Sequence, residues 1–317
     1  MGDLTVRTVR ARALVVAAAL AAGLVGAGTS HGVPGVGTAA PAAAPQAPAL
    51  EAAGDCSEQT PAPSSSLTGR KVQEIKNRGA NGTLVVGVDQ NSYNWGFRNP
   101  QSGQLEGFDI LLSRAIAKAV LGDANRVTFR TVTTAKRIEA IRNGTVDMVV
   151  RTMTINCERR KDIAFSAPYF STGQRLVVPK SDKSTTVAEA LKGKRACAAQ
   201  QSSSETELKK PGYGTSSVTI VENQLDCLVL MQLGKVDGTL TDSSLAAAQA
   251  AQDPAVRLVD ENIIPAKIGI GLKQEDTDLT ALVNQILLDY RANGGWQAAY
   301  DRWLAPSMGA NSAPYLP

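Results

Sequence analysis

The sequence predicts an α/β protein of two lobes, each an open sheet with helices on its faces. Short β-branched runs alternate with segments whose apolar residues recur at helical spacing. This alternation occurs as two separate series, over residues 83–150 and 194–251. Such alternation is typical of open α/β sheets, and 317 residues are enough for two domains.

Residues 1–30 have the layout of a secretory signal peptide. Three arginines, Arg7, Arg10 and Arg12, precede an apolar run from Ala13 to Val25, and small residues follow it. The run is shorter than the roughly 20 residues that span a bilayer. We therefore expect export, with an uncleaved membrane anchor as the alternative. No cysteine for lipid attachment lies near the end of the run, so a secreted protein, or one associated with the cell surface by other means, is expected.

Residues 31–66 are rich in Pro, Ala and Ser and poor in large apolar groups. This composition predicts an extended tether, with regular structure beginning near Leu67. The first series then comprises strands at 83–88, 127–132 and 146–150 and helices at 107–122 and 135–144. The second comprises strands at 194–199, 217–221 and 236–241 and helices at 203–210, 224–234 and 243–251. A strand at 266–272 and helices at 278–294 and 296–304 complete the prediction.

Charge and motif content exclude several classes of function. The formal net charge is +4, and the first dozen residues contribute +2 of it, so the rest of the chain has too little positive charge to favour a nucleic-acid partner. The single histidine, His31, lies in or just after the leader, which argues against Cys-His, Ser-His-Asp and His-zinc chemistry. Phosphate-loop and dinucleotide-binding motifs are missing. We therefore expect no cofactor, no metal and no catalysis.

Four cysteines occur in this chain: Cys56, Cys157, Cys197 and Cys227. An even number in an exported protein favours two disulfides, and four cysteines allow three pairings. Metal binding is the alternative, but no two cysteines have C-x₂₋₄-C spacing.

The segment "RTMTINCERRKD", residues 151–162, is a candidate anion site. On a strand, Thr152 and Thr154 would share one face, with Arg151 on the other. Arg159 or Arg160 would follow at a helix start, where a guanidinium can hold a carboxylate by two parallel hydrogen bonds. The alternative is that the threonines are ordinary strand residues and that "ERRKD" is a solvated turn.

Four segments carry a resemblance to a known family. They are "LEGFDILLSRAIAKAV", "RIEAIRNGTVDMVVRTMTINCERRKDIAFSAPYF", "GKRACAAQQSSSETELK" and "GKVDGTLTDSS". In this order they resemble the family 3 extracellular or periplasmic solute-binding proteins for polar amino acids, over about Leu67 to Leu304. The sequences around the cysteines most resemble the glutamine- and glutamate-binding proteins of high-GC Gram-positive bacteria.

The resemblance implies a two-lobed, type II periplasmic-binding-protein-like fold with two hinge crossovers. Residues 67–173 and 268–306 would form lobe 1, residues 174–267 lobe 2, and residues 307–317 a C-terminal tail. The hinges would lie near Gly173-Gln174 and Ala266-Lys267. It also implies disulfides between Cys197 and Cys227 and between Cys56 and Cys157.

Residue by residue, the resemblance implies a ligand site in the cleft between the lobes. Arg159 would bind the α-carboxylate, Thr152 and Thr154 the carboxylate and ammonium, and Asp242 the ammonium. The members of a strand-to-helix turn in lobe 2 would offer backbone N–H groups to the carboxylate: Gln200, Ser202 and Ser203. Gln201 replaces the glycine usual in the family.

The resemblance also implies a second part of this site, in the loop after the first strand. It would supply Asp89 and an aromatic side chain over the ligand, either Tyr93 or Trp95. Core packing is the alternative for Trp95. Arg151 would contact the ligand side chain or instead pair with Asp89.

The implied function is binding of a glutamate-, glutamine- or aspartate-like amino acid by a monomer that delivers it to an ABC importer. A ligand-sensing subunit for a membrane receptor is one alternative. An enzyme on the same fold, a dehydratase or a murein lyase, is the other.

Overall fold

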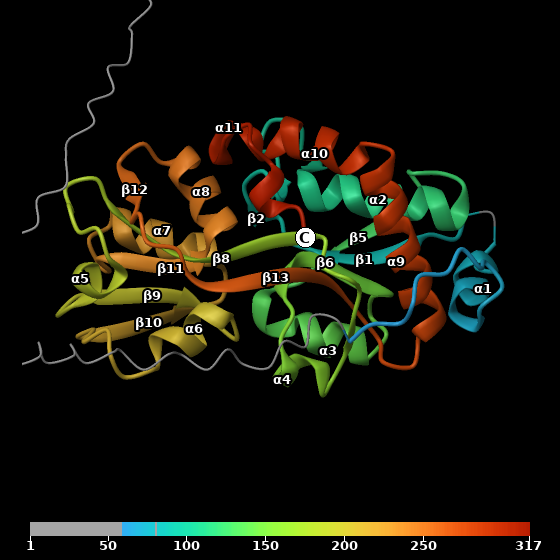
Figure 1. Ribbon diagram of the computed structural model, residues 1–317, viewed down its shortest axis with the longest axis horizontal. Helices are drawn as coiled ribbons and strands as arrows, with labels where there is room; N and C mark the ends of the chain where they lie inside the picture. The colour runs from blue at the N-terminus through green and yellow to red at the C-terminus, as the bar shows by residue number, and fades with distance from the viewer. Residues whose placement is uncertain (1–58, 80) are drawn as a thin grey trace, which may run out of the picture. The chain divides into compact units, whose positions relative to one another are not determined.

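A ten-stranded sheet forms the frame of the protein in residues 59–79 and 81–317, which the computed structural model describes (Figure 1). Its main path is β10-β9-β11-β8-β13-β6-β1-β5, with β12 paired to β8 and β7 paired to β13. A second, three-stranded sheet contains β2, β3 and β4.

The bounds of the strands are as follows: β1 Leu84–Val88, β2 Asn91–Ser92, β3 Gly96–Arg98, β4 Leu105–Glu106, β5 Val127–Thr131, β6 Met148–Thr154, β7 Ala164–Phe165, β8 Phe170–Pro179, β9 Arg195–Ala199, β10 Ser217–Val221, β11 Gly238–Asp242, β12 Val256–Leu258 and β13 Ile263–Leu272. The helices are α1 Arg70–Lys76, α2 Phe108–Leu121, α3 Arg137–Arg142, α4 Cys157–Arg160, α5 Val187–Leu191, α6 Ser203–Leu208, α7 Gln224–Gln232, α8 Ser243–Gln252, α9 Thr277–Ala292, α10 Gly295–Trp303 and α11 Ala305–Met308, with 3-10 turns η1 Thr134–Lys136 and η2 Ala313–Tyr315.

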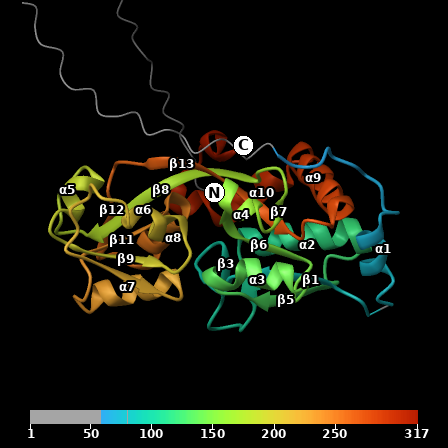
Figure 2. The ribbon, with the colours of Figure 1, turned by 90° about the horizontal axis from the view of Figure 1, so that it is seen from below.

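Two long antiparallel strands, β8 and β13, connect two groups of parallel strands. On one side β1 pairs in parallel with β5 and β6, and on the other β9 pairs in parallel with β10 and β11. β8 pairs with β11 of the second group, whereas β13 pairs with β6 of the first. Figure 2 shows both strands running from one group to the other. The predicted pair of α/β lobes is therefore confirmed.

Each lobe has its own hydrophobic core. The largest cluster of buried apolar side chains joins β1, β6 and the end of β13 to α2, α9 and α10. A separate cluster joins β8, β9 and β11 to α5 and α6. Every strand predicted for the two series is present. The residue pattern did not predict β8, although the resemblance implied a crossover near Gly173-Gln174.

The hydrogen-bonding register between β8 and β13 shifts between Ile263 and Ala266. Gly173 lies opposite this irregularity on β8, and a Cβ atom there would come within 2.4 Å of the Asn262 side-chain oxygen. A larger residue at position 173 would therefore require the Asn262 side chain to move.

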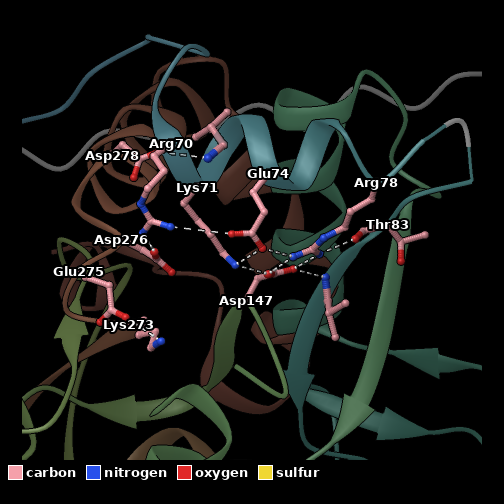
Figure 3. A network of polar contacts seen from close by, with 12 residues as sticks. Arg70, Lys71, Glu74, Arg78, Thr83, Asp147, Lys273, Glu275, Asp276 and Asp278 are labelled. Carbon is pink, nitrogen blue, oxygen red and sulfur yellow. Dashed lines mark hydrogen bonds and ion pairs between the residues drawn. The ribbon is translucent and has the colours of Figure 1, made fainter. Parts of the chain in front are cut away.

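The short helix α1 is fixed to the first lobe by a polar network (Figure 3). Arg78, just after the helix, donates to both carboxylate oxygens of Asp147 at 2.7 Å, and Lys71 approaches the same carboxylate at 3.3 Å. Arg70 pairs with Asp276. Val72 and Ile75 on the opposite face of the helix are fully buried, so apolar packing and ion pairs act together.

Residues 59–66 run along α9 without regular structure. The backbone N–H of Ser64 donates to the carbonyl oxygen of Ala281, and the Asn284 side chain donates to Thr60 and Pro61. The predicted signal peptide and the predicted tether up to residue 58 lie outside the described residues.

The predicted Cys197–Cys227 bridge is present and joins β9 to α7. Cys157 is also disulfide-bonded, and Cys56, its predicted partner, lies outside the described residues. Across residues 59–79 and 81–317, none of the helices has both the length and the apolar character needed to cross a bilayer.

Candidate functional site

A polar cleft lies between the two groups of strands, with an empty volume of about 430 Å³ that includes some open solvent. Eight of the residues predicted for the site line it: Asp89, Arg151, Thr152, Thr154, Arg159, Ser202, Ser203 and Asp242. The sequence interpretation missed nine others: Ser92, Thr134, Arg137, Gln174, Ala199, Ser204, Gln224, Thr241 and Leu245. Among the described residues that form this lining, the apolar side chains are those of Ala199 and Leu245.

Arg159 reaches the cleft from the single-turn helix α4. The Asn156 side chain caps this helix by accepting from the backbone N–H of Arg159 at 2.8 Å. The guanidinium donates to the carbonyl oxygen of Thr154 at 2.7 Å and, across the cleft, to that of Gln201 at 3.1 Å. Burial lowers the pKa of Arg159 to about 10, so the side chain stays positively charged at neutral pH.

Arg151 forms an ion pair with Asp89, and the nitrogen–oxygen distance is 2.9 Å. It also donates to the Thr134 hydroxyl at 2.9 Å, while its buried Nε has no partner. Asp89 further accepts from the Ser92 hydroxyl and from two backbone N–H groups of the same loop. Of the two contacts expected for Arg151, the structure therefore shows the pairing with Asp89.

The expectation that Arg151 and Thr152 point to opposite faces of β6 is wrong, because both line the cleft. Thr152 has a φ of 39°, which interrupts the extended backbone and with it the two-residue alternation. Its N–H donates to the buried carboxylate of Asp109 at 3.3 Å. Thr154 lies two residues further along, at the end of β6.

Asp242 is the last residue of β11 and caps the start of α8. One carboxylate oxygen accepts from the Thr172 hydroxyl at 2.8 Å and from the Ser244 N–H and hydroxyl at 2.9 and 2.6 Å. The other oxygen is buried and has no partner. Burial raises the pKa of Asp242 above its usual value, so a cation in the cleft would stabilise the ionised form.

The turn between β9 and α6 forms the wall opposite Arg159. Ser202 caps α6 by accepting from the Glu205 N–H at 3.0 Å, and the Ser203 hydroxyl is buried without a partner. Gln201 has a φ of 55°, a conformation that suits the glycine it replaces.

Gln200 does not line the cleft, which corrects its predicted role. Its side chain is exposed, and its N–H donates to the carbonyl oxygen of Val221 at 2.8 Å. The strand pairing of β9 with β10 thus uses the backbone group that was expected to meet a ligand.

Neither predicted aromatic residue lines this cleft. Trp95 is fully buried in the core of the first lobe, with its ring 4.9 Å from that of Phe170. Tyr93 instead lines a smaller adjoining cavity between the β2 loop and helices α7 and α8. Ser92, the residue before Tyr93, lines the cleft instead.

The cleft contains a third arginine, Arg137, at the start of α3. It is 4% exposed, and burial together with the nearby Arg159 and Arg151 moves its pKa well below the usual value. A cation in the first turn of a helix opposes the helix dipole, and this was the signal in the sequence that could have drawn attention to it. Within the described part of the chain, no group of three or more His, Cys, Asp or Glu side chains could hold a metal ion.

Comparisons with known proteins place this arrangement in a family. The family model described as bacterial extracellular solute-binding proteins, family 3, matches residues 84–306. A glutamine-binding protein of Geobacillus stearothermophilus is 36% identical over 204 residues, which are 64% of this chain and 76% of that protein. A glutamate-binding protein of Corynebacterium efficiens is 27% identical over 73% of this chain and 81% of its own.

Among solved structures, a solute receptor for L-cysteine from Neisseria gonorrhoeae superposes with a TM-score of 0.72 at 23% identity. The match covers 78% of this chain and 99% of the receptor. This likeness concerns the fold, and the predicted type II periplasmic-binding-protein-like fold is confirmed.

Proposed function

Because the chain belongs to family 3 of the bacterial extracellular solute-binding proteins, we propose that it binds an acidic or amide α-amino acid in the cleft and delivers it to an ABC importer. Relatives named as glutamine- and glutamate-binding proteins support this ligand class. The family description supports a site of action outside the cytoplasm. We propose a monomer that performs no catalysis, exported by the signal peptide at residues 1–30.

One observation carries the proposal: buried polar groups without partners face the same cleft from both lobes. In lobe 2 these are an oxygen of Asp242 and the hydroxyl of Ser203, and in lobe 1 the group is the Nε of Arg151. An α-ammonium would satisfy the carboxylate, and an α-carboxylate would accept from Ser203 and from Arg159 of lobe 1. Buried polar groups are normally hydrogen-bonded, so the ligand would complete the site.

Ligand contacts to both lobes would favour the closed arrangement over an open one. We propose that opening bends β8 near Gly173-Gln174 and β13 near Ala266-Lys267, with lobe 1 formed by 67–173 and 268–306 and lobe 2 by 174–267. The register shift between Ile263 and Ala266 supports bending in this part of β13. The Arg159–Gln201 hydrogen bond would break on opening.

A thermal-shift screen of the twenty amino acids tests the proposal, since a ligand that binds only the folded state raises its stability. We expect acidic or amide amino acids to raise the melting temperature. Arg159→Ala should abolish the shift, and the exposed control Arg142→Ala, outside the cleft, should keep it. The absence of any stabilising amino acid would refute the binding function, and a full shift with Arg159→Ala would refute the carboxylate assignment.

A further inference from the structure

The strand β6 carries part of the cleft, and its pairing with β13 is interrupted at that point. Met153 lies opposite Gly269 and Val149 lies opposite Gly271, so three residues of β6 stand against one residue of β13. Thr152 belongs to this bulge and has a φ of 39°. A bulge changes the direction in which the side chains of a strand point, and here it brings neighbouring side chains into the cleft.

The carboxylate of Asp109 accepts the hydrogen bond that Thr152 donates from its backbone. The distance from the Thr152 nitrogen to Oδ2 is 3.3 Å, and Oδ1 accepts from the Tyr169 hydroxyl at 2.9 Å. Asp109 is 1% exposed and lies in the first turn of α2, where the helix dipole favours a negative charge. It is not one of the residues that line the cleft, so it contacts β6 without reaching the ligand.

The backbone conformation of Thr152 is unfavourable for its residue type. A positive φ is uncommon outside glycine, asparagine and aspartate, and a β-branched side chain makes it more so. In an extended strand, Arg151 and Thr152 would point to opposite faces. Because Arg151 is paired with Asp89, relaxation of the bulge would turn Thr152 away from the cleft.

We propose that Asp109 is a positioning residue for the cleft: it holds the backbone of Thr152 in the left-handed conformation and so keeps Thr152 facing the ligand. This inference rests on the proposed function and adds to it a residue that contacts no ligand. The Tyr169 hydroxyl fixes the carboxylate from its other oxygen, which leaves Oδ2 directed at β6.

Isothermal titration calorimetry with glutamate, glutamine, aspartate and asparagine tests the inference, on variants whose folding is first checked by circular dichroism. Asp109→Leu removes both acceptor oxygens and should weaken binding of the best of the four ligands by roughly 10- to 100-fold. Asp109→Ser, whose shorter side chain does not reach Thr152, should weaken it similarly and replaces the leucine variant if that one does not fold. Asp109→Asn keeps an acceptor oxygen, and the Tyr169 hydroxyl can accept as well as donate, so binding should stay within a few-fold.

A glycine at position 152 separates positioning from a general structural role. Glycine adopts a positive φ without steric cost, so its backbone depends much less on Asp109. In the Thr152→Gly background, Asp109→Leu should therefore change the affinity by no more than about threefold. An equal loss in both backgrounds would overturn the inference.

Ser113→Ala is the matched control on the same helix. Ser113 is fully buried and donates to the backbone carbonyl oxygen of Asp109 at 2.7 Å, so its removal perturbs α2 but leaves the bond to Thr152. The four affinities should not change. A loss as large as that of Asp109→Leu would attribute the effect to a general disturbance of α2 and overturn the inference.

The outcomes distinguish this inference from the proposed function. Unchanged binding by folded Asp109→Leu and Asp109→Ser would overturn the role of Asp109 while leaving amino-acid binding intact. If the unmodified protein bound none of the twenty amino acids, the proposed function would fail, and this inference with it.

Discussion

The Cys197–Cys227 disulfide closes a segment of lobe 2 and should be a large single contribution to its stability. Both half-cystines are fully buried, and the bridge joins the middle of β9 to α7 across 30 residues of chain. In the chain-entropy relation, removing a cross-link that closes a loop of this length lowers the free energy of unfolding by about 3.6 kcal/mol at 25 °C. The reason is that the unfolded chain regains the conformations that the cross-link had excluded.

Alanine substitutions measure this effect. Cys197→Ala and Cys227→Ala each remove the same cross-link. The free energy of unfolding of each single variant should therefore fall by about 3–5 kcal/mol, and the upper end of this range includes the effect of the missing sulfur atom in the core. The double variant should lose little more than either single one. Such non-additivity is the expected signature of two residues that act as one unit.

Urea unfolding of the ligand-free protein, followed by circular dichroism, gives the free energy of unfolding and its urea dependence. The urea dependence should rise in all three variants, because an unfolded chain without the cross-link exposes more surface. A loss below about 1 kcal/mol in the single variants, or losses that add in the double variant, would refute the loop-entropy reasoning.

Two further predictions concern buried polar groups of lobe 1. Burial raises the pKa of Asp109 to about 7, above its value of about 3.9 in an unfolded chain. The folded state therefore binds more protons between these pH values, and this group should make stability fall as pH rises from about 4 to 7, by up to about 1.4 kcal/mol per pH unit. Asp109→Asn should remove that contribution from the pH profile of urea unfolding; an unchanged profile would contradict the assignment. Asn284 accepts from the Ala167 N–H at 2.7 Å and donates to Thr60 and Pro61, so Asn284→Ala should lower stability by about 1–3 kcal/mol by leaving buried groups unpaired. Proteolysis near residues 59–66 should accelerate in this variant but not in the control Gln285→Ala, which removes only an exposed contact; equal cleavage rates would show that Asn284 does not hold this segment.

Much of the fold could be predicted because its signals are local. The strands and helices of both series have apolar residues at periods set by backbone geometry, and the bounds agree closely with those observed. The residue pattern did not reveal β8, because its first half, "FSTGQ", lacks a regular alternation of apolar and polar residues; the crossover there was implied only by the resemblance. The helix α1 was missed because it is short and depends on partners far along the chain, Asp147 and Asp276.

Residues of the cleft were predicted where they belong to a sequence motif. They were missed where only the folding of the chain brings them to the cleft. Arg159, Thr154 and Asp242 belong to recognisable segments, and all line the cleft. For Trp95 the sequence left a ligand contact and core packing open, and the structure shows core packing.

The sequence by itself determined the class of the protein: a chain with two α/β lobes, without a histidine in residues 59–317, and with segments that resemble those of the family 3 solute-binding proteins. The tertiary structure alone decided which charges in that cleft cancel. Asp89 and Arg151 neutralise each other, whereas the buried Arg137 forms no ion pair with any other residue that the structure describes. The reason is physical: the energy of a buried charge depends on distances to groups from other segments, and those distances exist only after the chain has folded.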